Sequence, residues 1–139
     1  MPDPLPPDIV EQILLGEAAG EGITGLQFVR DVLFNRATAQ HKTLEEVATA
    51  PKQFSAYARP DLAKFYQQQP ATLRRLAQQL IAEARQPDYQ PAYPEEHYVA
   101  SDFYEKRMNL PKNHWIHKME PSRTVGRHVA LRPVKNPTP

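Results

Sequence analysis

The run GEAAGEGITGLQFVRDVLFNR, residues 16–36, holds four of the chain's five glycines and then a glycine-free stretch with helical periodicity. Glycine lets the backbone turn tightly and weakens a helix, so the cluster predicts a break between two helices. The second helix is expected over residues 24–38. Its core face is predicted to carry Leu26, Val29, Val32, Leu33 and Ala37. The fold is therefore expected to begin with two helices joined by a glycine-rich turn.

The helix before this turn places a carboxylate at the end of an apolar stripe. Asp8 can cap the helix, with Glu11 three residues on as the partner in a capping box. One face then carries, at the i, i+3, i+4, i+7 spacing, Val10, Ile13, Leu14 and Glu17. A partly buried carboxyl group retains its proton more readily, as a general acid requires. Glu17 is thus a candidate catalytic acid, and the alternative is a solvated glutamate at a helix end.

Beyond residue 38, prolines divide the chain into further elements. Short helices are predicted over residues 43–50 and 61–69, each ending before a proline. The strongest helical periodicity covers residues 71–86. After it, the runs HYVASDFY (97–104) and TVGRHVALR (124–132) favour short strands or extended segments. The predicted fold class is α+β, mainly α, with a few short strands in the C-terminal third.

Length and composition restrict the classes of protein further. At 139 residues with 40% hydrophobic and 24% charged residues, the chain has the composition of one globular domain. Its formal net charge of +1 argues against a nucleic-acid binder, and the absence of cysteine excludes disulfides, thiolate metal ligands and cysteine nucleophiles. We expect a domain over residues 8–132 between proline-rich tails at 1–7 and 133–139, with no signal peptide and no stable membrane insertion.

Four motifs, in order over roughly residues 9–131, resemble those of the SleB-type cell wall hydrolases. The quoted run holds the first two, an E-A-x-G-E block and, after a further glycine, a helix that ends in Asn-Arg. The matching positions in the run are Glu17, Gly20, Glu21, Gly25, Asn35 and Arg36. Further matches are the Q-F-S motif, Gln53 to Ser55, and a late G-x-H-V element that contains Gly126 and His128. Ala19 stands where the family usually has arginine, and Ala130 and Leu131 replace its terminal aromatic residues.

The resemblance implies a compact, single-domain, lysozyme-like fold and cleavage of the bond between N-acetylmuramic acid (MurNAc) and N-acetylglucosamine (GlcNAc) in peptidoglycan. Glu17 would protonate the glycosidic oxygen and then act as base on the muramyl C6 hydroxyl, so that a 1,6-anhydro ring closes, as in a lytic transglycosylase. Glu21 is the candidate second carboxylate of a hydrolytic muramidase. Alternatively, Glu21 holds the glycine-rich turn by hydrogen bonds.

The expected substrate-binding residues are amides, hydroxyls and aromatic rings. Asn35, Gln53 and Ser55 offer neutral groups suited to N-acetyl and hydroxyl recognition. Among the aromatic residues, Tyr98 and Trp115 are the favoured platforms for sugar rings. His128, from the late motif, completes the set.

Two other functions remain open from the sequence. His97, His114 and His117 could serve a zinc-dependent murein amidase, although no H-E-x-x-H run exists; we expect no metal and no cofactor. A noncatalytic glycan-binding protein is the other alternative. The expected partner is the peptidoglycan glycan strand, and the expected state is a monomer. We expect the protein to stay in the cytoplasm until lysis of the phage type releases it to the cell wall, or to be carried by a virion or a secretion apparatus.

Overall fold

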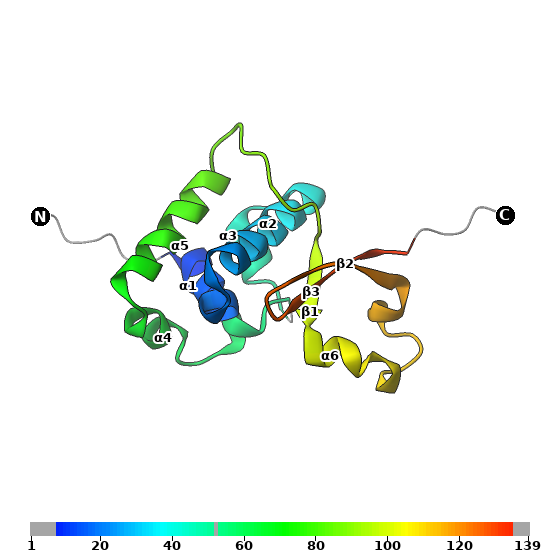
Figure 1. The fold of residues 1–139 in the computed structure, drawn as a ribbon. Coiled ribbons are helices and arrows are strands. Elements are labelled where there is room, and N and C mark those ends of the chain that lie inside the picture. The colour runs from blue at the N-terminus through cyan, green and yellow to red at the C-terminus, as the bar shows by residue number, and fades with distance from the viewer. Residues whose placement is uncertain (1–7, 52, 135–139) are drawn as a thin grey trace, which may run out of the picture.

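Five α-helices build the body of the molecule in the computed structural model, which describes residues 8–51 and 53–134 (Figure 1). They are α1 (Ile9–Ala18), α2 (Gly22–Gln40), α3 (Leu44–Ala48), α4 (Leu62–Gln68) and α5 (Ala71–Ala84). A small sheet and a sixth short helix, α6 (Ser101–Glu105), follow in the C-terminal part. The predicted class, α+β and mainly α, is confirmed.

Helix α1 starts and ends as its sequence dictates. The Asp8 side chain accepts the N–H of Val10 at 2.6 Å, and the Glu11 side chain completes the predicted capping box. A 3₁₀ turn, Ala19–Glu21, then separates α1 from α2. Gly16 does not break the helix. It lies within α1 where a Cβ atom would come within 2.7 Å of the Ala56 Cβ, so glycine allows the following loop to pack closely.

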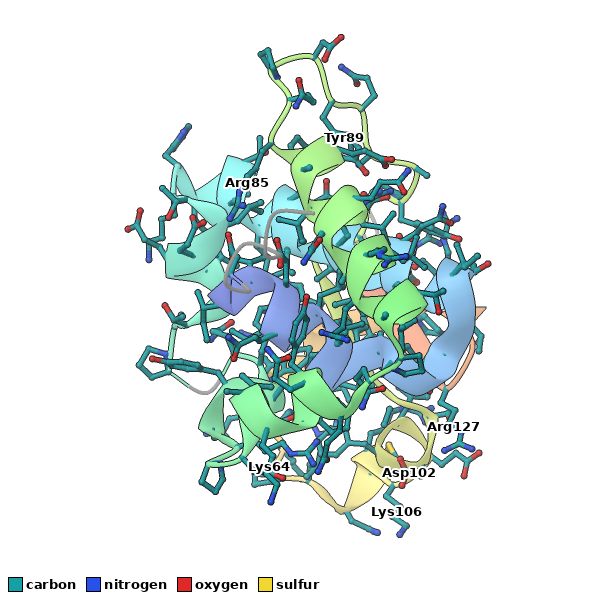
Figure 2. The ribbon with its side chains drawn as sticks, turned by 90° about the vertical axis from the view of Figure 1, so that its left-hand side faces the viewer. Lys64, Arg85, Tyr89, Asp102, Lys106 and Arg127 are labelled. Atoms are coloured by element: carbon teal, nitrogen blue, oxygen red, sulfur yellow. The ribbon has the colours of Figure 1, made fainter. Side chains whose placement is uncertain are left out.

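The core forms around α1, which contacts α2, α3, α4 and α5. The predicted stripe of α2 is buried, and so are the α5 side chains Ala77, Leu80, Ile81 and Ala84. Figure 2 shows α5 on the side that faces the viewer, with Arg85 near its end. Arg85 forms ion pairs with Asp8, at 2.6 Å, and with Glu45, and so ties the starts of α1 and α3 to α5. In the described residues, no helix is both long and apolar enough to cross a membrane.

The sheet has three antiparallel strands in the order β1-β3-β2. They are β1 (His97–Ala100), β2 (Met119–Val125) and β3 (His128–Pro133), with β2 and β3 joined by a tight turn. Residues 101–104, which were expected to be extended, instead form most of α6. Most of β2 was not predicted, because Pro121 and a register shift interrupt the alternation of buried and exposed side chains. Pro133 belongs to β3 rather than to a tail, while residues 1–7 and 135–139 lie outside the described part.

Polar side chains of α2 hold the irregular segment 85–96 that leads into β1. The buried Asp31 carboxylate accepts the backbone N–H groups of Ala92 and Tyr93 at 2.9 and 3.2 Å. One turn on, Asn35 donates to the carbonyls of Tyr93 and Glu95 at 2.7 and 2.9 Å. These bonds satisfy backbone groups that no sheet or helix serves, and they fix where β1 begins.

Candidate active site

A cleft of about 550 Å³ opens between the end of α1, the loop around residues 53–55 and the β1–α6 region. Most of the residues predicted for the site line it: Glu17, Gln53, Ser55, Tyr98, Trp115 and His128. Arg36, Phe103 and His114 line it as well. The cleft thus joins residues from distant parts of the sequence around one carboxyl group.

The Glu17 carboxylate is half-buried and accepts three hydrogen bonds. The Tyr98 hydroxyl donates to Oε1 at 2.8 Å. The Ser55 hydroxyl and the Ala56 backbone N–H both donate to Oε2 at 3.2 Å. The three donors come from two separate segments, so they fix the carboxylate in one orientation at the cleft wall.

Tyr98 holds Glu17 by a hydrogen bond, a contact that was not part of the sugar platform predicted for it. Its ring packs edge-on against Phe28 at 5.6 Å and against His128 at 4.6 Å, between ring centroids. Burial of the hydroxyl, with the negative charge of Glu17, raises the pKa of Tyr98 well above its ordinary value. The hydroxyl therefore remains a donor to Glu17 throughout the neutral range.

Exposed aromatic rings form the wall contributed by α6 and the turn Trp115–Lys118. Trp115 is 44% exposed and Phe103 is 40% exposed. His114 lies between them, with ring centroids 5.5 Å from Trp115 and 6.2 Å from Phe103. Apolar ring faces of this kind suit contact with the C–H faces of sugars. Trp115 thus lies where a platform would be needed. The sequence pattern gave no signal for Phe103 and suggested His114 only as a zinc ligand.

Glu21, the candidate second carboxylate, does not line the cleft. Its Oε2 accepts the backbone N–H of Arg127 at 2.9 Å, in the turn between β2 and β3. Gly126 in that turn has a φ of 58°, and a Cβ atom there would come within 2.2 Å of the same oxygen. The Arg127 side chain itself is exposed at the periphery (Figure 2). The observed contact is therefore structural, but Glu21 holds the β2–β3 hairpin turn and not the glycine-rich turn that the sequence suggested.

Asn35 also lies outside the cleft lining. Its amide nitrogen is engaged with the carbonyls of Tyr93 and Glu95. Its place on α2 does not support the sugar-binding role that was predicted, because the same amide secures the segment before β1.

His128 borders the cleft, but its two ring nitrogens are shielded from solvent and form no hydrogen bond of normal geometry with the described residues. Burial lowers the pKa of His128, and the charges of Glu21 and Glu17 and the Glu17 backbone carbonyl offset this only in part. The imidazole is therefore neutral at neutral pH. With its nitrogens enclosed, it supports Tyr98 by packing, and the predicted substrate contact has no support from its position.

The lowered pKa of His128 makes stability dependent on pH on the acid side. An unfolded histidine, with a pKa near 6.5, binds a proton more readily than the buried one, so stability falls as the pH drops below about 6.5. We expect His128→Phe, which keeps an aromatic ring beside Tyr98, to reduce the loss of Tm between pH 7.5 and 5. Part of the loss should remain, because burial also lowers the pKa of His97. His117→Gln, at an exposed position, is the control, and an unchanged pH profile in His128→Phe would contradict the prediction.

The histidines proposed for zinc do not gather into a ligand set. No group of three His, Cys, Asp or Glu side chains that could hold a metal ion occurs within residues 8–51 and 53–134. The His114 Nδ1 atom already accepts the backbone N–H of Ile116 at 3.2 Å. The geometry therefore gives the amidase alternative no support.

Comparisons of the chain with protein-family models, with curated proteins and with solved structures found no match.

Proposed function

We propose that the protein cleaves the MurNAc–GlcNAc glycosidic bond of peptidoglycan, with Glu17 as the general acid and base. The observation that carries the proposal is the Glu17 carboxylate, held by three donors in a cleft that also has an exposed aromatic wall. A fixed carboxyl group that can act as a general acid and a platform for sugar rings both favour cleavage of a glycosidic bond. The motif resemblance to the SleB-type hydrolases, with a lysozyme-like fold, points to the same substrate.

In the proposed reaction, protonated Glu17 donates its proton to the glycosidic oxygen as the bond to the muramyl C1 atom breaks. Hydrogen bonds from Tyr98, Ser55 and the Ala56 N–H stabilise the carboxylate that remains. The same carboxylate then accepts the proton of the muramyl C6 hydroxyl, whose oxygen bonds to C1. The product ends in a 1,6-anhydro ring, and Glu17 is again protonated.

The cleft favours this route over hydrolysis by two carboxylates. Glu17 is the one carboxylate among the described residues that line it, while Glu21 is bonded to the hairpin turn. Ordinary glycosidases place two carboxyl groups on either side of the scissile bond. A single carboxyl group with an internal hydroxyl as nucleophile therefore fits this cleft better than the Glu17–Glu21 pair of a muramidase.

The mass of the products tests this choice. Digests of purified walls are expected to contain muropeptides one water lighter than hydrolysis products, with few reducing ends. Glu21→Gln should yield the same anhydro products at a rate close to that of the original protein, because the amide oxygen can still accept the Arg127 N–H. Mass spectrometry before and after borohydride reduction measures both results. Reducing muramic acid as the main product, with an inactive Glu21→Gln variant, would replace the transglycosylase by a muramidase.

The glycan strand is the partner that this proposal requires. Access to the wall after lysis, or delivery by a virion or secretion apparatus, would bring the enzyme to it. A noncatalytic glycan-binding protein would bind the strands and leave the mass distribution of the walls unchanged, so the same digest separates the two classes.

A further inference from the structure

Arg36 is a buried cation that has only neutral hydrogen-bond partners in the described residues. It lies on α2 with 6% of its surface exposed. Its Nε donates to the Glu96 carbonyl, Nη1 donates to the Gln53 Oε1 at 3.3 Å, and Nη2 lies 3.5 Å from the His97 Nδ1. None of the carboxylates in residues 8–51 and 53–134 forms an ion pair with it.

The other buried arginine of α2 is paired with carboxylates. Arg30, 5% exposed, lies 3.1 Å from the Asp31 carboxylate and 3.0 Å from that of Glu83. Burying a charge costs free energy, which is why buried charges in proteins are normally paired. Burial lowers the pKa of the Arg36 guanidinium, and the neighbouring Tyr98, Glu96 and Glu17 offset this only in part. The positive charge of Arg36 is therefore incompletely compensated in the free protein.

Arg36 also lines the same cleft as Glu17. A guanidinium group has five N–H donors, and the neutral partners engage one at each nitrogen, so Nη1 and Nη2 each keep a further N–H. Two such donors in one plane match the two oxygens of a carboxylate. The uncompensated charge and the remaining donors thus both favour an anionic ligand at this end of the cleft.

We propose that Arg36 binds a carboxylate of the substrate while Glu17 acts on the neighbouring glycosidic bond. This inference rests on the proposed function and specifies its substrate. MurNAc carries a lactyl carboxyl group at C3, which GlcNAc lacks. The lactyl group is free in strands without stem peptides and is an amide where a peptide is attached, in which case the peptide supplies carboxylates of its own. Arg36 would accordingly select muramic strands over neutral GlcNAc oligomers.

Binding to the full chain carrying Glu17→Gln tests this without cleavage. The probes are a peptide-free GlcNAc–MurNAc oligomer, its methyl ester, a GlcNAc oligomer of equal length and a peptide-bearing oligomer, measured by calorimetry. The free acid is expected to bind about 10- to 100-fold more tightly than the ester, the range for a hydrogen bond to a charged group. Adding Arg36→Gln should remove this preference and leave the affinity for the ester unchanged. Arg127→Gln, at an exposed position outside the cleft, is the matched control and should keep the preference.

Three other outcomes of the binding experiment each decide a separate point. Equal affinity for acid, ester and GlcNAc oligomer in the Glu17→Gln protein would overturn the role of Arg36 while leaving the proposed function intact, and this comparison does not depend on Arg36→Gln folding. Binding of none of the four probes would instead contradict the proposed function. If the peptide-bearing oligomer binds as tightly as the free acid and loses that affinity in Arg36→Gln, the role of Arg36 stands, with the stem peptide as the source of the carboxylate.

Discussion

Glu17→Gln is expected to reduce cleavage of purified walls by about 10²- to 10⁴-fold, the range typical of general acid catalysis. The amide nearly matches the carboxyl group in shape, and its oxygen can still accept either the bond from Tyr98 or the two bonds from Ser55 and the Ala56 N–H. It cannot donate a proton to the leaving oxygen in the way an acid does. Clearing of wall suspensions and the rate of product release measure the effect.

The control for this variant is Glu120→Gln. Glu120 forms an ion pair with Arg132 at 2.9 Å on the edge strand β2 and does not line the cleft. It should clear walls at the normal rate. Circular dichroism of both variants should match that of the original protein, so that a loss of activity in Glu17→Gln reports chemistry. A Glu17→Gln variant that cleaves walls at the normal rate would remove the basis of the proposed function.

The helices were predictable because their signals are local. The Asp8 and Glu11 pair lies within four residues, and the capping box it predicts is present. The stripe of α2 repeats every three to four residues, and all its predicted members are buried. The prolines at positions 51 and 70 also marked the ends of two short helices. The predicted ranges, 43–50 and 61–69, agree with the observed α3 and α4 to within a few residues.

The site was predictable only in part, because its contacts join residues far apart in the chain. Glu17 and Ser55 were identified through motifs, but the bond between Tyr98 and Glu17 spans 81 positions and no spacing rule gives it. Asn35 was interpreted as a sugar ligand because an amide in a family motif suits that role. Its partners are carbonyls about 60 residues later, in a segment without periodicity.

The same segment depends on a second residue of α2 that the sequence did not single out. Asp31 is fully buried, and its carboxylate accepts four hydrogen bonds. The donors are the Arg30 guanidinium, the Tyr89 hydroxyl and the backbone N–H groups of Ala92 and Tyr93. Burial, together with the bond to Asp31, raises the pKa of Tyr89 well above its ordinary value, so the hydroxyl stays protonated and continues to donate. Figure 2 shows Tyr89 where the chain leaves α5.

Asp31→Asn is therefore expected to lower the free energy of unfolding by about 3–5 kcal/mol, the range for breaking a buried ion pair by removing one partner. The amide presents donors where Asp31 has only acceptors, so some of its present donors lose their partner, and the charge of Arg30 is left with the half-exposed Glu83. Urea unfolding followed by circular dichroism measures the change. Glu120→Gln, which breaks an exposed pair, should cost less than about 1 kcal/mol. A loss as small as this in Asp31→Asn would show that the segment before β1 does not depend on the carboxylate.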